Sequence, residues 1–352
     1  SFKNMNSYQL SEFDFEFPPQ LIALRTAGKG KTRILHCSKS GSHTSILKAP
    51  QILDLLKKGD CIVVNNTKVF PARLFGKTPF GGQVEALLVQ ALNPSKNGKA
   101  RFEALVKPGR AFSLNKSVFL AGVFAEVENI LEDGTRILRF EITPQELEKL
   151  LEKEGHIPLP PYIQRPDDQS DKEAYQSIFA KQTGAVAAPT ASLHFSQEML
   201  NQIKEKGVSI AEVTLHVGPG TFQNINTEDF REHQMHGEHY ELTEKNAQII
   251  NETKERQGRV IAIGTTSTRV LETIASEDGR IQAQKGLTRA FIYPGYRYKI
   301  TDGLLTNFHW PKSSLILLVA AFYGKENTLA AYQKAIENQM QLFSYGDGML
   351  IL

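Results

Sequence analysis

The chain has 352 residues, 41% of them hydrophobic and 22% charged, and its formal net charge is +3. This composition is that of a globular protein, and the length allows one large or two medium domains with a sizeable buried core. A charge this close to zero permits an RNA partner, but it restricts any nucleic-acid site to a local patch.

The two cysteines, Cys37 and Cys61, form no C-x-x-C pair and cannot by themselves build a cysteine zinc site or an iron–sulfur cluster. The first twenty residues contain Asp14 and Glu16 in place of a basic start and an apolar run, so we expect no signal peptide. The longest apolar run, residues 315–322, is too short to span a bilayer. We therefore expect a cytoplasmic protein with no membrane segment.

Short β segments separated by turns fill the region between about residues 60 and 141, and no helical periodicity interrupts them. The expected strands cover residues 61–65, 72–77, 84–91, 102–107, 123–130 and 136–141. Glycine-containing turns fall at residues 81–82, 97–98 and 133–134. About six strands at this spacing predict a compact antiparallel β-barrel.

The pattern then changes to helices. A capping box with proline at the first helical position, Thr143-Pro-Gln-Glu146, opens a helix that should end near Gly155. Further helices are expected at 170–184, 196–207, 243–258 and 265–276, with two more near the C-terminus, and strands at 208–217, 259–263 and 290–293. This alternation predicts an α/β (or α+β) main domain, residues 1–64 and 156–352, with an inserted antiparallel β-barrel domain, residues 65–155.

Three histidines recur at a spacing of three, His233, His236 and His239, with Glu238 among them. The spacing allows a metal site. However, the motif is not H-E-x-x-H, and Gly237 weakens the helix that would bring His233 and His236 onto one face. Metal binding, solvated surface histidines, and acid/base or substrate-contacting histidines therefore all remain open.

A run of small residues, 184–192, precedes His194. Such a run lets a ligand approach the backbone, and Thr190 and His194 could handle protons beside it. The alternative is a tightly packed turn where a helix docks on a sheet.

The turn Gly218-Pro-Gly220-Thr221 follows an expected strand and superficially resembles a nucleotide-binding loop. The third glycine of G-x-G-x-x-G is missing and no helical pattern begins at once, which argues against a dinucleotide site. We expect a tight turn that closes a pocket, aided by His216.

At Gly264 an expected strand ends, and the hydroxyl-rich turn of Thr265, Thr266 and Ser267 opens the helix that carries Arg269. Free N–H groups and the positive end of the helix dipole suit a phosphate or a carboxylate there. Simple helix capping by Thr265 or Ser267 is the alternative.

The segment Asn307-Phe-His309-Trp310 places an amide, an imidazole and two aromatic rings before an apolar helix. This combination suits stacking on a purine and hydrogen bonding to it. Core packing of Phe308 and Trp310 is the alternative.

Taken together, these motifs resemble one family, the S-adenosylmethionine:tRNA ribosyltransferase-isomerases of the queuosine pathway. The resemblance covers nearly the whole chain, and it depends on the order and spacing of nine motifs: FDFEFP (13–18), NNTKVFPARLFG (65–76), EGHIPLPPYI (154–163), GAVAAPTASLHF (184–195), VTLHVGPGTF (213–222), HQMHGEHY (233–240), GTTSTRVLE (264–272), TNFHWPKSSL (306–315) and SYGDGMLIL (344–352). The chain departs from the family pattern at Asn66, Lys68, Ser192 and Trp310, which puts in doubt any detailed role for Asn66, Lys68 or Trp310.

The resemblance implies an α/β domain with an inserted barrel, no metal and no tightly held cofactor. It also implies that S-adenosylmethionine, as co-substrate, donates its ribosyl portion to the 7-aminomethyl-7-deazaguanine base at the tRNA wobble position. Epoxyqueuosine would form in the tRNA, and adenine and methionine would leave. We expect tRNA with a guanine-derived wobble base as partner, and a monomeric enzyme.

This chemistry needs three proton transfers, which we assign as a hypothesis to His194, His236, Glu238 and His309. The turn from Gly264 to Arg269 is assigned to the methionine carboxylate or a tRNA phosphate. The remaining substrate-binding candidates are Thr190, His216, Gly218, Gly220, Thr221 and Asn307, and the candidate tRNA phosphate contacts are Lys29, Lys31, Arg33, Lys107 and Arg110.

Three rival interpretations remain at this point. A methyltransferase would use the Gly218-Pro-Gly220 turn as its cofactor loop. A non-catalytic RNA-binding module would bind RNA with the barrel and would not need the histidine clusters. A metal-dependent hydrolase would use His233, His236 and His239.

Overall fold

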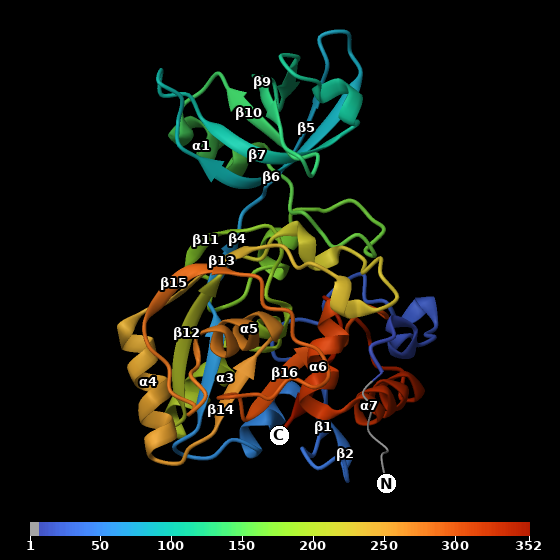
Figure 1. Ribbon diagram of the computed structural model, residues 1–352, viewed down its shortest axis with the longest axis vertical. Coiled ribbons are helices and arrows are strands. Elements are labelled where there is room, and N and C mark those ends of the chain that lie inside the picture. Colours follow the sequence, from blue (N-terminus) through green and yellow to red (C-terminus); the bar gives the residue numbers. More distant parts are fainter. Residues whose placement is uncertain (1–6) are drawn as a thin grey trace.

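The computed structural model describes residues 7–352. A small β-barrel lies above a larger sheet-and-helix body, and two chain segments connect them (Figure 1). The barrel strands come from the first half of the sequence, whereas strands from both ends of the chain build the body. The predicted fold class, an α/β body with an antiparallel β-barrel, is confirmed.

The body is built on a nine-stranded sheet. Its order is β15 (Gln284–Thr288), β13 (Glu238–Leu242), β12 (Ser209–Leu215), β3 (Cys61–Asn65), β14 (Val260–Ile263), β16 (Gly303–Asn307), β17 (Gly348–Ile351), β1 (Arg33–Cys37) and β2 (Thr44–Lys48). The neighbours β12, β3, β14 and β16 run parallel. Their carboxyl ends therefore meet at one edge of the sheet, where α/β proteins bind ligands.

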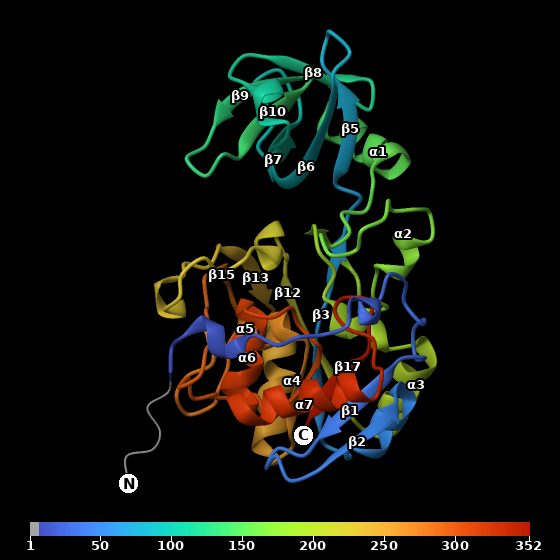
Figure 2. The same cartoon turned by 90° about the vertical axis from the view of Figure 1, so that its right-hand side faces the viewer.

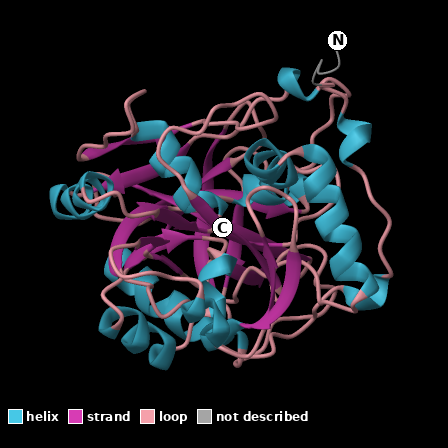
Figure 3. Ribbon diagram, turned by 90° about the horizontal axis from the view of Figure 1, so that it is seen from below, coloured by secondary structure: helices cyan, strands magenta, loops and turns pink. Residues whose placement is uncertain are grey.

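Helices cover both faces of this sheet (Figures 2 and 3). Within β3, Val63 packs on one side, with α4 (Glu244–Glu255), α5 (Thr265–Ile274), α6 (Ser314–Tyr323) and α7 (Lys325–Glu337). Ile62 and Val64 point to the other side, toward α3 (Gln197–Glu205) and the 3-10 helix η3 (Ala49–Asp54). This alternation is the period of two that a strand buried on both faces requires.

The barrel closes in the order β10 (Arg136–Phe140), β7 (Arg101–Lys107), β6 (Gln83–Leu92), β5 (Arg73–Lys77), β8 (Ser117–Leu120) and β9 (Val123–Ile130). Its interior has its own apolar core, to which α1 (Pro144–Glu154) adds Leu147 and Leu151. The predicted capping box is present, since Thr143 Oγ1 accepts from the Glu146 N–H and the Glu146 carboxylate accepts from the Thr143 N–H.

The two connections between barrel and body run side by side. β4 (Thr67–Val69) pairs with β11 (Gln182–Ala185), and Arg73 and His156 exchange backbone hydrogen bonds. Gly155 is needed here, because a Cβ at this position would lie 2.0 Å from the Pro71 carbonyl oxygen. The short remaining elements are α2 (Asp171–Ala174), η1 (Leu10–Phe13), η2 (Pro19–Leu21), η4 (Gly109–Phe112), η5 (Thr190–His194), η6 (Pro219–Phe222) and η7 (Phe230–Glu232).

Three of the expected elements form differently in the structure, and several strands, such as β8 and β13, were not expected. Residues 61–65, grouped with the barrel segments, form β3 in the middle of the main sheet. The expected helix 170–184 shortens to Asp171–Ala174, because the Asp171 carboxylate is bound by Arg165 and Tyr345 and residues 182–185 pair with β4 instead. The expected strand 290–293 is irregular, and β15 forms earlier, where it pairs with β13.

The predicted domain limits, residues 1–64, 65–155 and 156–352, stay a prediction, and residues 1–6 lie outside the described part of the chain. Within the described part, none of the helices combines the length and the apolar character needed to cross a bilayer.

Candidate functional site

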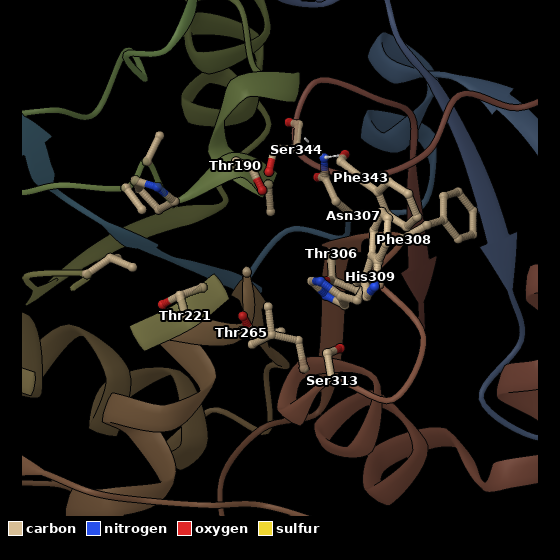
Figure 4. Close-up of a pocket in the computed structure, with 18 of the residues that line it drawn as sticks. Thr190, Thr221, Thr265, Thr306, Asn307, Phe308, His309, Ser313, Phe343 and Ser344 are labelled. Atoms are coloured by element: carbon tan, nitrogen blue, oxygen red, sulfur yellow. Dashed lines mark hydrogen bonds between the residues drawn. The ribbon is translucent and has the colours of Figure 1, made fainter. Parts of the chain in front are cut away.

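A cavity of about 350 Å³ lies at the carboxyl edge of the sheet (Figure 4). Gly264 and Thr265 line it where β14 passes into α5, and Asn307 lines it where β16 ends. Ser313, the N-cap of α6, closes another side. We call this space cavity 1, and two helix N-termini border it.

Cavity 1 is lined by uncharged residues: no Asp, Glu, Lys or Arg belongs to its described lining. Hydroxyl and amide groups alternate with the rings of Tyr162, Phe308, Trp310 and Phe343. Tyr162 and Trp310 stack with their planes 10° apart, and Trp310 keeps 37% of its surface exposed. Aromatic walls with neutral donors and acceptors suit a flat, uncharged heterocycle such as a nucleobase.

His309 is the histidine that lines cavity 1. Its Nε2 lies 2.7 Å from Thr306 Oγ1, and its Nδ1 has no hydrogen-bond partner among residues 7–352. Burial lowers the pKa of His309 to about 3, so the ring is neutral at physiological pH. A neutral imidazole fixed at one nitrogen can offer or accept a proton at the other.

His194 lies behind the cavity wall and is fully buried. Its Nδ1 is 2.7 Å from Thr32 Oγ1 and its Nε2 is 2.8 Å from Asn307 Oδ1. The Asn307 amide nitrogen donates in turn to the carbonyls of Phe343 and Ser344 (Figure 4). Both ring nitrogens are therefore engaged with protein, and burial holds the pKa of His194 below its usual range.

A second cavity of about 910 Å³, cavity 2, separates the barrel from the body. Unlike cavity 1, it is lined by Asp, Glu, Lys and Arg side chains, and its carboxylates, Glu238 apart, lie on one side. The barrel and α1 contribute acidic residues, while β12, β13 and the neighbouring loops contribute basic ones; the described lining includes Glu103, Asp133, Glu148 and Glu152 on the first side and His216, His233, His236, His239 and Arg289 on the second. This arrangement suits a ligand with both cationic and anionic groups.

Close glycine contacts position two of these histidines. A Cβ at Gly184 would lie 2.7 Å from His216 Nδ1, and one at Gly220 would lie 2.8 Å from His236 Cδ2. His216 is further held by Thr67 Oγ1, 2.8 Å from Nδ1, and burial lowers its pKa. Gly184 was predicted to let a ligand approach the backbone, and Gly220 was predicted to belong to a tight turn; in the structure both glycines make room for an imidazole.

A buried ion pair lies on the body side of cavity 2. Arg269 Nη2 donates to Glu238 Oε1 over 2.6 Å, and Glu238 Oε2 accepts the N–H of Gly218 over 2.7 Å. Both side chains are at least nine-tenths buried. The Gly218-Pro-Gly220 turn therefore anchors a charged pair through its backbone.

The structure brings nearly all of the predicted site residues to these two cavities. Cavity 1 receives Thr190, Gly264, Thr265, Thr266, Asn307 and His309, cavity 2 receives His216, Gly218, Gly220, His236, Glu238 and Arg269, and Thr221 lines both. His194 and Ser267 line neither, and the Ser267 hydroxyl is buried without a partner among the described residues.

Several lining residues were not among the predicted site residues. Tyr162, Ser313 and Ser344 fall inside motifs that carry the family resemblance, which was a usable signal. Asp133 and Glu148 lie in the barrel segment and come near the site only through tertiary packing. No sequence pattern pointed to them.

The predicted phosphate contacts differ in their surroundings. Arg33 donates to the carbonyls of Asn338 and Gln339 at the end of α7, and Lys29 donates to the carbonyl of Glu173. Lys107 and Arg110 are exposed on the barrel. No group of three or more His, Cys, Asp or Glu side chains in residues 7–352 is arranged to hold a metal ion.

The two cavities are adjacent. Their linings share Val217, Thr221, Gln223 and Leu315, so one partition of four residues separates the neutral space from the charged one.

Comparisons with known proteins agree on one family. A family described as queuosine biosynthesis protein matches residues 10–351. A relative from Syntrophomonas wolfei, named S-adenosylmethionine:tRNA ribosyltransferase-isomerase, is 43% identical over 99% of both chains. A relative of the same name from Clostridium kluyveri is 45% identical over 97% of this chain and 99% of its own. The crystal structure of S-adenosylmethionine tRNA ribosyltransferase from Thermotoga maritima is similar, with a TM-score of 0.54 and 31% identity over 97% of this chain and all of that one.

Proposed function

Because the chain belongs to the queuosine biosynthesis protein family, we propose that it is an S-adenosylmethionine:tRNA ribosyltransferase-isomerase. The proposed acceptor is the 7-aminomethyl-7-deazaguanine base at the wobble position of tRNA. The ribosyl portion of S-adenosylmethionine is transferred to its amine and rearranged to the epoxide of epoxyqueuosine. Adenine and methionine leave.

One observation supports this proposal: an uncharged cavity and a charged cavity lie next to each other and share four lining residues. The two substrates together bring a neutral adenosyl group, a sulfonium, an amino acid and a charged acceptor amine. The uncharged, aromatic cavity 1 is suited to adenosine, and the larger, charged cavity 2 is suited to the extruded wobble base. The ribosyl group, at which bonds break and form, would then lie beside Val217 and Thr221.

The proposed reaction needs three proton transfers, and we assign roles in them to side chains that line cavities 1 and 2. The sulfonium acidifies the C5′ hydrogens, so a base must remove one; adenine leaves more readily when it is protonated; and the acceptor amine must be deprotonated before it attacks. We assign a hydrogen bond to the departing adenine, donated by the neutral imidazole, to His309, and the amine and C5′ steps to His236 and His216. His194 acts as a positioning residue that holds Asn307 at the cavity wall.

Doubly labelled S-adenosylmethionine tests the reaction. The protein is incubated with ribosyl- and methyl-labelled S-adenosylmethionine and tRNA that carries the aminomethyl precursor base. Ribosyl label in the tRNA together with free adenine and methionine supports the proposal. Methyl label in the tRNA together with S-adenosylhomocysteine identifies a methyltransferase, and the absence of turnover favours a binding protein.

A further inference from the structure

Arg269 has more hydrogen-bond donors than the protein satisfies. It is 3% exposed, and one nitrogen, Nη2, donates to Glu238. Its Nε and Nη1 atoms are also buried and have no acceptor among residues 7–352. Arginine stays charged in proteins, and buried donors of a charged group without acceptors are strongly unfavourable. The two free nitrogens therefore point to an anionic ligand.

Glu238 holds the guanidinium in one orientation. Its Oε1 accepts from Arg269 and its Oε2 accepts from the Gly218 N–H, so each carboxylate oxygen already has a donor. Glu238 was predicted to transfer protons, but this geometry favours a positioning role. With Nη2 fixed by Glu238, the free donors of Arg269 are prearranged for a second acceptor.

The position of Arg269 on α5 relates the two cavities. Thr265 and Thr266, in the first turn of α5, line cavity 1, whereas Arg269 lines cavity 2. One helical turn, about 5.4 Å along the axis, separates them. α5 therefore contributes lining residues to both cavities, one turn apart.

We propose that Arg269 binds the α-carboxylate of S-adenosylmethionine, so that the co-substrate spans both cavities with its sulfonium at the common partition. This inference rests on the proposed function. Four bonds link the sulfur to the carboxylate carbon, about 5 Å when extended, so the carboxylate lies well beyond the sulfonium as seen from the base. The free nitrogens are buried, so a small group on a flexible tether reaches them more easily than a phosphodiester held between two riboses.

The fluorescence of Trp310 provides a binding assay that does not depend on turnover. Trp310 is the single tryptophan of the chain and lines cavity 1. Three ligands are titrated: S-adenosylmethionine, its decarboxylated analogue, which keeps the sulfonium and the amine, and adenosine. The wild-type protein is expected to bind S-adenosylmethionine about 10- to 100-fold more tightly than the decarboxylated analogue. Equal affinities would overturn the proposal without any variant.

Substitutions then locate the carboxylate contact. Arg269→Gln is expected to abolish the preference for the carboxylate and to leave adenosine affinity within about twofold. Arg280→Gln is the control, because Arg280 is an exposed arginine that lines neither cavity, and it should keep the preference. Glu238→Gln should weaken the preference, and Glu238→Asp should restore part of it if Glu238 acts by orienting Arg269.

Two outcomes separate this inference from the proposed function. If S-adenosylmethionine neither binds nor turns over, the function and the inference both fail. If it binds and reacts but Arg269→Gln keeps the carboxylate preference, this inference alone is wrong. Retained preference with weaker tRNA affinity in Arg269→Gln would show that the anion is an RNA phosphate.

Discussion

The Nε2 atom of His194 lies 2.8 Å from the Oδ1 atom of Asn307, and Asn307 lines cavity 1 while His194 does not. The imidazole therefore supports the cavity wall from behind. His194→Ala would leave Asn307 Oδ1 and Thr32 Oγ1 without their partner.

We expect His194→Ala to lower the free energy of unfolding by about 1–3 kcal/mol, because two buried polar groups lose a hydrogen bond. Urea denaturation measures this change. If His194 positions Asn307, the KM for S-adenosylmethionine should rise more than kcat falls. A kcat loss of several orders of magnitude with normal stability would instead show direct proton transfer by His194.

Gly220→Ala tests whether the position of His236 matters. The new Cβ would lie 2.8 Å from His236 Cδ2, so we expect the imidazole to be displaced and the ribosyl-transfer rate to fall at least about tenfold. Gly218→Ala is the matched control in the same turn, since the closest atom to its Cβ is Glu238 Oε2 at 3.8 Å. If both variants retain the wild-type ribosyl-transfer rate, the position of His236 does not matter for catalysis.

The buried imidazoles should make stability depend on pH. Burial lowers the pKa of His309 to about 3, whereas the unfolded chain has the ordinary value of about 6.5. As pH falls below about 6.5, the unfolded state binds a proton that the folded state does not, so the free energy of unfolding decreases.

The decrease should not exceed about 1.4 kcal/mol per pH unit for this group, and it should continue toward pH 3. Urea denaturation at pH 7.5, 6.0 and 5.0 measures it. His309→Gln should have a shallower pH dependence than wild type. Identical slopes for the two proteins would contradict a neutral His309 in the folded state.

Exposed basic residues on the barrel should affect tRNA affinity more than Arg33 does. Lys107 and Arg110 are exposed, so replacing both with alanine is expected to weaken tRNA binding and to reduce its salt dependence. Arg33 is bound to two carbonyl groups at the end of α7, so Arg33→Ala should lower stability and leave tRNA affinity nearly unchanged. Filter binding at two salt concentrations, with thermal denaturation beside it, distinguishes these effects.

The sequence by itself determined the family, the fold class, most of the α-helices and about half of the strands. The Thr143 capping box, the β-branched run at residues 61–65 and the glycine turns act locally, through hydrogen bonds and backbone preferences that neighbouring residues set. The motifs around Gly264 and Asn307 also contain several of the residues that line cavity 1, because strand ends carry their side chains to one edge of a parallel sheet.

Only the tertiary structure decided which partner each side chain meets. His194 and His309 are both histidines in family motifs, yet one is hydrogen-bonded at both nitrogens behind the wall and the other keeps Nδ1 free in the lining. The pairing of Glu238 with Arg269 joins residues 31 positions apart. Burial and orientation depend on elements distant in sequence, so no local pattern could have shown that two buried nitrogens of Arg269 have no acceptor in residues 7–352.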